Sequence, residues 1–225
     1  MRYADRLANR FSPRTEAGTP PVTGGLFKRG FDIAGALAGI VLLSPLLLML
    51  AALVKFSDGG RIFYGHRRIG RNGAVFRCWK FRTMVENGDE VLMAYLAANP
   101  AEREEWSASR KLQNDPRVTR VGVVLRKLSL DELPQVLNIL RGEMSFVGPR
   151  PVVKDELELY GTAAPYYLST RPGLTGLWQV SGRNDVSYGA RVAFDRHYVE
   201  NWSFVSDLKI LIRTVPAVFM SRGSY

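Results

Sequence analysis

Two adjacent carboxylates, Asp131 and Glu132, have the residue types and the spacing best suited to chemistry in this sequence. Ser129 stands where a helix N-cap is expected, and Glu132 three positions later completes a capping-box pattern. This pattern predicts that both carboxylates lie in the first turn of a helix. Because a helix N-terminus stabilises ionised carboxylates and phosphates, Asp131 is a candidate nucleophile toward a phosphoryl group. Glu132 would then orient a metal ion or handle a proton.

The same carboxylates also have a purely structural explanation. Acidic residues in a first helical turn interact favourably with the helix macrodipole, and Glu132 could act only as the capping partner of Ser129. The spacing alone favours this simpler explanation. Several cationic residues along the chain could bind a phosphate, because arginine and lysine bind phosphate oxygens strongly. These residues are Lys80, Arg82, Arg126 and, in a proline-rich turn, Arg150.

The composition is that of a basic chain with a hydrophobic core of ordinary size. The 225 residues are 46% hydrophobic and carry a formal net charge of +10, which predicts one main domain and a polyanionic partner. Composition alone does not separate nucleic acid, anionic lipid and phosphorylated substrates as that partner. The single cysteine, Cys78, excludes a disulfide framework within the chain and is expected to be a small packed residue.

An uncharged apolar run of 22 residues occupies positions 33–54, which is long enough to cross a bilayer core. Ser44 and Pro45 lie at its midpoint, where proline removes a helix hydrogen bond. Basic residues flank the run on both sides, so the positive-inside rule places both ends in the cytoplasm. We therefore expect a re-entrant helical hairpin bent at Ser44-Pro45. The alternatives are a kinked transmembrane span and a buried core helix.

Three segments are expected along the chain: a flexible leader over residues 1–25, a re-entrant membrane helix over 26–58 and a cytosolic catalytic domain over 59–225. The leader is not a signal peptide, because the first apolar run begins too late and is too long. The fold class is α+β and membrane-associated, with a small mixed α/β catalytic domain and interfacial amphipathic helices.

Within the third segment, residues 59–85 carry seven Lys or Arg residues and no acid, and they alternate like a β-hairpin that turns near Asn72 and Gly73. Residues 86–112 predict one or two polar helices interrupted at Asn99-Pro100. Residues 198–219 predict an amphipathic helix that lies either in the membrane interface or against the core. A turn-rich loop is expected around residues 171–176.

The ordered motifs of the chain resemble those of the monotopic phosphoglycosyl transferases, the bacterial sugar transferase family that starts lipid-linked glycan assembly. The resemblance covers nearly the whole chain after the leader, and Leu177-Trp178-Gln179-Val180-Ser181-Gly182-Arg183 is most similar to the short exopolysaccharide-type members. Glu143 stands where the family usually has aspartate. The motifs are Lys28-Arg29-x-x-Asp32, Ser44-Pro45, Lys80-Phe81-Arg82-Thr83-Met84, Ser129-Leu130-Asp131-Glu132-Leu133-Pro134-Gln135, Val147-Gly148-Pro149-Arg150-Pro151 and Arg171-Pro172-Gly173-Leu174-Thr175-Gly176.

The resemblance implies transfer of hexose-1-phosphate, galactose or glucose, from a UDP-sugar to polyprenyl (undecaprenyl) phosphate, with release of UMP. This would be the first membrane step of exopolysaccharide or related glycan assembly. Asp131 would form a phosphosugar-aspartate intermediate and bind Mg²⁺, and Glu132 would assist. The phosphate-binding residues would be Arg126, Arg150 and Arg183, together with Lys80 and Arg82.

The expected location is the bacterial inner membrane, with the catalytic domain on its cytoplasmic face. The expected partners are the UDP-sugar, polyprenyl phosphate, the membrane and downstream glycosyltransferases, but not nucleic acid. A non-enzymatic, membrane-anchored basic module that binds anionic lipid or nucleic acid is the competing interpretation. It explains the charge and the apolar run, but it gives no reason for carboxylates between clusters of arginines.

Overall fold

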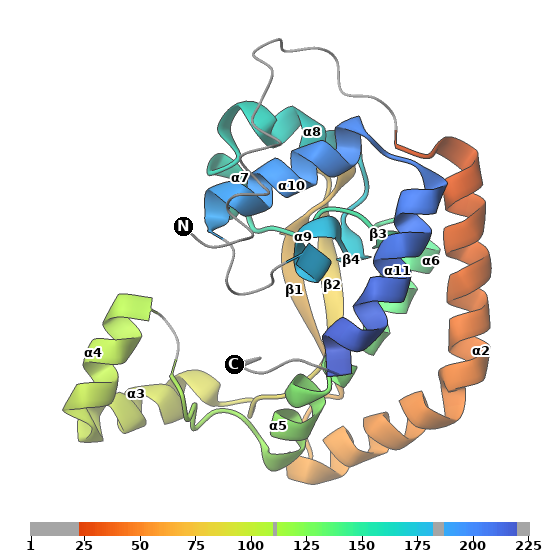
Figure 1. Ribbon diagram of the computed structural model, residues 1–225. Coiled ribbons are helices and arrows are strands. Elements are labelled where there is room, and N and C mark those ends of the chain that lie inside the picture. Colours follow the sequence, from red (N-terminus) through yellow and green to blue (C-terminus); the bar gives the residue numbers. More distant parts are fainter. Residues whose placement is uncertain (1–22, 110–111, 182–186, 220–225) are drawn as a thin grey trace. The chain divides into compact units, whose positions relative to one another are not determined.

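The computed structural model describes residues 23–109, 112–181 and 187–219 (Figure 1). The chain divides into two compact units. The described part of unit 1 comprises residues 23–42, 65–79 and 135–219 without 182–186, and that of unit 2 comprises residues 43–64 and 80–134 without 110–111. The predicted leader lies almost entirely outside the described residues. The expected domain boundaries at residues 25 and 58 remain a prediction.

The apolar run forms the middle of one long helix, α2 (Gly25–Asp58), which is long and apolar enough to cross a membrane. Only 11% of its most apolar 18-residue stretch is buried, whereas the core helix of a soluble protein is mostly buried. The helix is continuous through Ser44, with Pro45 inside it, so the structure does not divide α2 into the two arms of the expected hairpin. Gly59, with φ 76°, ends α2 in the left-handed conformation that glycine adopts readily.

The predicted β-hairpin is confirmed as strands β1 (Phe63–Ile69) and β2 (Val75–Phe81), which are neighbours in a two-stranded sheet. A short 3₁₀ turn, η1 (Arg71–Gly73), connects them. Asn72 has φ 57° and Gly73 has φ 79°, as the tight turns of β-hairpins require. Both strands run through the boundary between the two units, since β2 contributes residues 75–79 to unit 1 and residues 80–81 to unit 2.

Unit 1 also contains a parallel pair of short strands, β3 (Ser145–Val147) and β4 (Gly173–Thr175), with Ser145 opposite Gly173. The sequence predicted a loop at β4. The two backbones are so close that a Cβ added at Gly173 would lie 2.1 Å from the Gly148 backbone nitrogen. Glycine is therefore required there for backbone packing.

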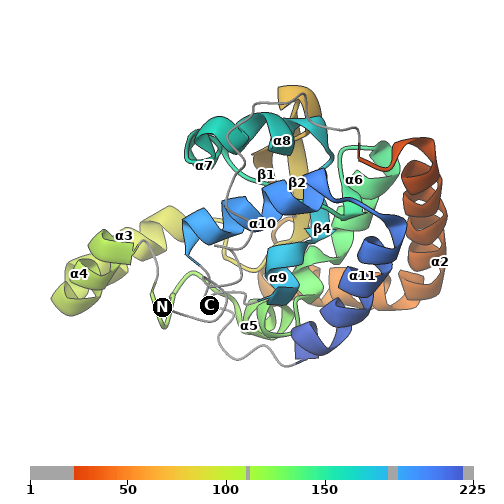
Figure 2. The ribbon, with the colours of Figure 1, turned by 45° about the horizontal axis from the view of Figure 1, so that its top comes forward.

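Helices surround this strand pair in unit 1, and α9 lies between α10 and α11 in both views (Figures 1 and 2). The helix predicted over residues 198–219 begins only at Phe204, because its first residues belong to the preceding helix. The helices are α6 (Val136–Arg141), α7 (Lys154–Glu158), η3 (Gly161–Ala163), α8 (Ala164–Ser169), α9 (Leu177–Ser181), α10 (Tyr188–Glu200) and α11 (Phe204–Phe219).

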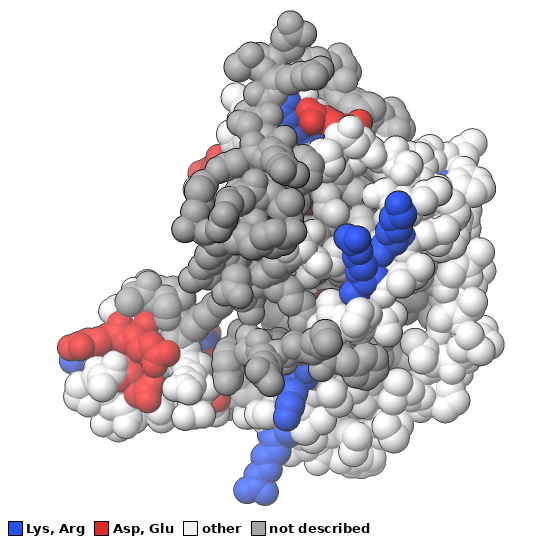
Figure 3. All heavy atoms as spheres, in the orientation of Figure 1, with Lys and Arg blue, Asp and Glu red and all other residues white. Residues whose placement is uncertain are grey.

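Helix α11 combines the two roles that the sequence left open. Ile210 is buried in a core cluster with Val147 and Tyr198, whereas Ile212 and Val215 are exposed. Basic side chains project from α11 over a surface that is otherwise uncharged (Figure 3). One side of the helix therefore packs against unit 1, and the other presents apolar and basic side chains together.

Unit 2 is built on the second half of α2. Leu50 and Val54 pack with Phe81 and Leu125 in one buried cluster. The described residues between 88 and 109 form two helices interrupted at Asn99, as predicted, and acidic side chains gather over them (Figure 3). The remaining helices are α3 (Gly88–Ala98), α4 (Pro100–Ser109), α5 (Arg120–Lys127) and η2 (Leu130–Gln135).

Candidate active site

Asp131 and Glu132 lie in the 3₁₀ helix η2 and not in the first turn of a capped α-helix. The predicted capping box is wrong. Ser129 has φ 54°, and its backbone N–H donates to the Arg126 carbonyl oxygen at 3.1 Å, which leaves that N–H unavailable to Glu132. Pro134 lies inside η2. The tight turn therefore presents the two adjacent carboxylates without the capping role that the sequence favoured.

Lys80 forms ion pairs with both carboxylates. Its Nζ lies 2.6 Å from Glu132 Oε1 and 3.3 Å from Asp131 Oδ2. The contact joins the end of β2 to η2 across about fifty residues of chain. A single ammonium group thus neutralises part of the charge of two neighbouring carboxylates, which explains how both can be anionic side by side.

Asp131 occupies a buried environment, with 8% of its surface exposed. Burial raises the pKa of the Asp131 carboxyl, and the negative charge of Glu132 raises it further, whereas Lys80 and Arg126 lower it. The net direction is upward from the ordinary aspartate value. Burial and specific charge partners that act together on one pKa are typical of catalytic acids, bases and nucleophiles.

Arg126 lies beside this pair, and Arg82 has other partners. The Arg126 Nε donates to Thr83 Oγ1 at 2.9 Å, and the charge of Asp131 raises the Arg126 pKa against the larger effect of burial, which lowers it. Arg82 forms ion pairs with Asp58 and Glu86. Lys80 and Arg126 are therefore the predicted cations that the structure brings to the carboxylates, whereas Arg82 ties β2 to the end of α2.

Two further arginines were predicted to bind phosphate. Arg150 belongs to unit 1, where it is exposed and its guanidinium carbon lies 5.9 Å from the centre of the Trp178 ring. Arg191 lies 4.6 Å from the centre of the same ring. Arg183 lies outside the described residues. Both assignments remain predictions.

Comparison with known proteins places this arrangement in a family. The family model described as "Bacterial sugar transferase" matches residues 23–221. The chain belongs to the bacterial sugar transferase family. It is 64% identical to the exopolysaccharide production protein ExoY of Sinorhizobium fredii, with all of both chains covered. The family resemblance seen in the motifs is thereby confirmed.

Two other relatives have names that state a reaction. The sugar transferase is 52% identical to the undecaprenyl-phosphate galactose phosphotransferase of Salmonella typhimurium over 88% of this chain and 41% of the relative. It is also 38% identical to the UDP-glucose:undecaprenyl-phosphate glucose-1-phosphate transferase of Caulobacter vibrioides, over 92% of this chain and 74% of the relative. Both relatives are transferases that act on undecaprenyl phosphate.

A buried amide that sequence reasoning missed fixes β2 just before Lys80 of the sugar transferase. Asn138 accepts a hydrogen bond from the Trp79 backbone N–H at 3.0 Å and donates to the Arg77 carbonyl oxygen at 2.7 Å. It also donates to Glu143 Oε2 at 2.6 Å. Glu143 therefore has a structural partner in unit 1. The available signal was an asparagine within the apolar stripe of α6, because a buried amide must find partners.

The carboxylate pair fits Mg²⁺, a cation that sites for phosphate chemistry usually bind through one or two carboxylates plus substrate oxygens. Among the residues that the structure describes, no group of three or more carboxylates, histidines or cysteines gathers to form a site made by the protein alone. Asp131 and Glu132 could supply one or two oxygens to such an ion. A resident cation held entirely by the described side chains is not supported.

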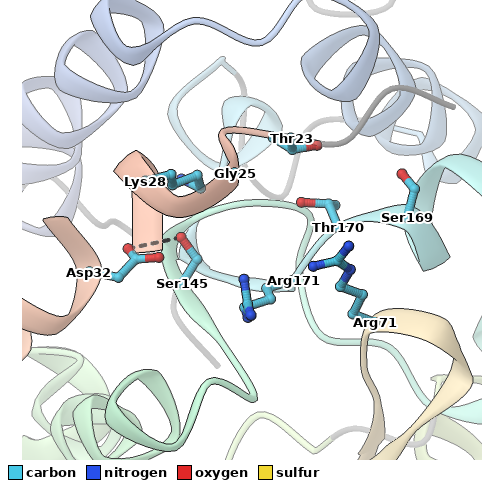
Figure 4. A pocket seen from close by; sticks show the side chains of 9 residues that line it. All are labelled: Thr23, Gly25, Lys28, Asp32, Arg71, Ser145, Ser169, Thr170 and Arg171. Atoms are coloured by element: carbon cyan, nitrogen blue, oxygen red, sulfur yellow. Dashed lines mark hydrogen bonds between the residues drawn. The ribbon is translucent and has the colours of Figure 1, made fainter. Parts of the chain in front are cut away.

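A small polar cavity lies beside the start of α2 in unit 1 (Figure 4). Its lining includes Lys28, Asp32, Arg71 and Arg171, and Asp32 accepts a hydrogen bond from Ser145 Oγ at 3.0 Å. The cavity volume of about 10 Å³ is enough for roughly one water molecule. This cavity is therefore too small for a sugar nucleotide.

Proposed function

We propose that this protein transfers hexose-1-phosphate, with galactose or glucose as the sugar, from a UDP-sugar to undecaprenyl phosphate. The names of its relatives support both substrates and both sugars. The observation that carries the proposal is the attachment of Asp131 and Glu132 to Lys80, beside Arg126. A basic module that only binds anions would have no need for a buried carboxylate with a second carboxylate beside it, both partly neutralised by one lysine.

In the proposed first step, an Asp131 carboxylate oxygen attacks the phosphorus that carries the sugar. A bond forms between this oxygen and the phosphorus, and the bond from the phosphorus to the bridging oxygen breaks, so that UMP leaves with the electron pair. In the second step, an oxygen of undecaprenyl phosphate attacks the same phosphorus and the Asp131 carboxylate leaves. The product is a lipid-linked diphosphate sugar, and Asp131 is restored.

The side chains around Asp131 have separate roles in this route. Arg126 has a planar guanidinium that can bind two phosphate oxygens and offset the charge that develops in both steps. Lys80 keeps Glu132 in place and compensates its charge while Asp131 is covalently occupied. Mg²⁺, when bound by Asp131 and Glu132, would further neutralise the phosphate oxygens.

The membrane arrangement that we propose is a re-entrant α2 on the cytoplasmic face of the bacterial inner membrane. Contacts at its first turns support this arrangement, because Lys28 pairs with Asp207 and Asp32 with Ser145, and both partners follow α2 in the chain. If α2 crossed the membrane, these later residues would have to cross back. No described helix other than α2 is long and apolar enough to do so. A cytoplasmic site could hand its lipid product to downstream glycosyltransferases.

Cysteine labelling tests the arrangement in a Cys78→Ala background. Leu26→Cys lies at the start of α2, and Glu90→Cys lies beyond its end; both original side chains are exposed. In intact spheroplasts, an impermeant maleimide should label neither variant, whereas after permeabilisation it should label both. Labelling of Leu26→Cys in intact spheroplasts would instead establish a kinked transmembrane span.

A panel of UDP-sugars tests the reaction. The detergent-solubilised protein is incubated with Mg²⁺, undecaprenyl phosphate and each UDP-hexose, and UMP and the lipid-linked product are measured. We expect one galactose or glucose donor to yield both products in equal amounts. If none of the common UDP-hexoses releases UMP, the transferase assignment fails and the anion-binding module is favoured.

A further inference from the structure

A groove of about 390 Å³ opens in unit 2 at the point where α2 ends. This volume is within the range of small-molecule sites. Its walls are largely apolar, with Phe63 partly exposed and Ile62 packed into the buried cluster of unit 2. The groove is lined by Lys55, Gly60, Arg61, Ile62 and Phe63.

The walls of the groove are continuous with the residues that support the carboxylates. The Phe63 ring stacks on Phe81 with their centres 5.5 Å apart. Phe81 follows Lys80 directly in β2 and shares a hydrophobic cluster with Ile62. Leu130 and Leu133, which flank the carboxylate pair in η2, contact the same cluster. One packed cluster therefore supports both the groove and Asp131.

Cations surround the groove. Lys55 is exposed, and 86% of the Arg61 side chain is accessible. Arg82 lies against Gly60 so closely that a Cβ there would lie 1.9 Å from Arg82 Nη1. The Arg82 Nε and Nη1 atoms are buried and make no hydrogen bond within the described residues, although Nη1 lies 3.5 Å from Glu86.

Two carboxylates, Asp58 and Glu86, offset part of this charge. Asp58 pairs with Arg82, and Glu86 pairs with both Arg61 and Arg82. Three cations and two carboxylates leave a net positive charge around the groove. An anionic group would be attracted by this charge and could reach the exposed Lys55 and Arg61 side chains that line the groove.

The groove begins where the apolar surface of α2 ends, since Leu53 and Phe56 are still exposed on the last turns of the helix. A ligand that suits both the apolar walls and the cationic rim has a hydrocarbon chain with a phosphate at one end. A sugar nucleotide fits less well, because the walls offer few groups to pair with its hydroxyls and base.

We propose that this groove binds the polyprenyl phosphate acceptor, with its first isoprene units against Ile62 and Phe63 and its phosphate beside Lys55 and Arg61. The inference rests on the proposed function. It assigns the lipid acceptor to residues different from those that bind the sugar nucleotide. A lipid held by the cluster that supports η2 would present its phosphate to the phosphosugar on Asp131.

Measuring the two half-reactions separately, UMP release and transfer to the lipid, tests this inference independently of the transferase assignment. Phe63→Ala should raise the KM for undecaprenyl phosphate about tenfold, from the loss of one large apolar contact. The burst of UMP released without lipid acceptor should not change. Tyr64→Ala is the matched control, because it removes the next aromatic side chain of the same strand, which does not line the groove. The variant Arg61→Gln should raise the same KM about threefold.

Three outcomes would overturn the assignment. Phe63→Ala could raise the lipid KM no more than Tyr64→Ala does. It could raise the KM for the UDP-sugar equally. Or it could weaken binding to phosphatidylglycerol vesicles with an unchanged lipid KM, which would assign the groove to bulk phospholipid. Phe63→Leu, which keeps an apolar side chain, should recover most of the affinity and serves as the check on folding.

A photoreactive polyprenyl phosphate provides a measurement that does not need turnover. It should label peptides that contain residues 55–63 of the unmodified protein, and undecaprenyl phosphate should compete. Labelling confined to other peptides would overturn the assignment. If the unmodified protein shows no UMP burst, the proposed reaction fails, and this labelling still decides the lipid site.

Discussion

Two lysine–carboxylate clusters, one in each unit, show how similar side chains can serve opposite purposes. In unit 1, Lys28 pairs with Asp207 at 2.5 Å, with side chains only 8% and 3% exposed. Asp207 also accepts hydrogen bonds from Tyr198 and Trp202. In unit 2, Lys80 is shared by Asp131 and Glu132, and the side chains are 31%, 12% and 36% exposed.

The two clusters differ in how many side chains donate to the carboxylate and in how far solvent reaches it. Asp207 accepts hydrogen bonds from three side chains and is 2% exposed, so its contacts fasten α2 to α10 and α11 and a ligand cannot reach it. Within the described part of the chain, Lys80 is the one side-chain donor to Asp131, and solvent can reach the pair. A buried ion pair with several donors holds a fold together, whereas a carboxylate that has one side-chain donor and is reached by solvent can react.

The largest expected effect comes from Asp131→Asn. An amide is a poor nucleophile, so the rate of sugar-phosphate transfer should fall on the order of 10⁴- to 10⁶-fold. The thermal midpoint should change little, since Asp131 has few partners. The transfer rate, from product formation, and the thermal midpoint, from scanning calorimetry, can be measured on one preparation. Appreciable turnover, free of contaminating unmodified enzyme, would end the nucleophile assignment.

Asp207→Ala should produce the opposite pattern. Removing one partner leaves the buried Lys28 ammonium uncompensated, which should lower the free energy of unfolding by about 3–5 kcal/mol. The remaining folded protein should keep its rate per molecule. Denaturant unfolding in detergent measures the loss, and Lys28→Met combined with Asp207→Leu should restore part of it. A folded, stable Asp207→Ala protein would contradict the anchoring role.

Glu132→Gln tests the second carboxylate. Glutamine keeps the size of the side chain but loses the charge that pairs with Lys80 at 2.6 Å. We expect transfer to fall about 10²-fold, a typical effect for an assisting group, with little change in stability. Steady-state kinetics with the preferred UDP-sugar decides this. Unchanged activity would return Glu132 to a structural role.

The smallest expected effect concerns a third carboxylate. Burial raises the pKa of Asp195 from 3.8 to about 7, although Tyr160 and nearby arginines oppose the shift. A carboxyl whose pKa is raised by folding contributes stability when protonated, and this contribution is lost as the pH rises. The thermal midpoint should therefore fall between about pH 4 and pH 7. Asp195→Asn should flatten this slope, and a slope that persists would contradict the assignment.

The sequence predicted the elements well where a single local pattern decides them. The hairpin turn at Asn72-Gly73, the helix break at Asn99 and the long apolar helix all follow from residue types within a short window. The capping-box prediction was wrong for two reasons. Lys80, about fifty residues away in the sequence, pairs with Glu132, and the Ser129 backbone N–H donates to the Arg126 carbonyl oxygen. Local patterns do not contain such long-range partners.

The site shows the same division. Motifs identified Lys80, Arg126 and both carboxylates, but only the fold shows that they meet. Arg82 is also a cation and lies two positions after Lys80, yet it pairs with Asp58 and Glu86 instead. Asn138 was missed because its role depends on backbone groups of β2, which no side-chain motif records.

The hydrogen bonds of Asn138 to β2 also limit how this family can vary in length. Side chains alternate between the two faces of a strand, so one residue inserted between Trp79 and Lys80 would turn the lysine to the opposite face. Asn138 would hold the strand before the insertion in place and prevent the slip from being absorbed there. Insertions should therefore be tolerated in the β1–β2 turn and excluded between Trp79, whose backbone is anchored, and Lys80, which pairs with the carboxylates.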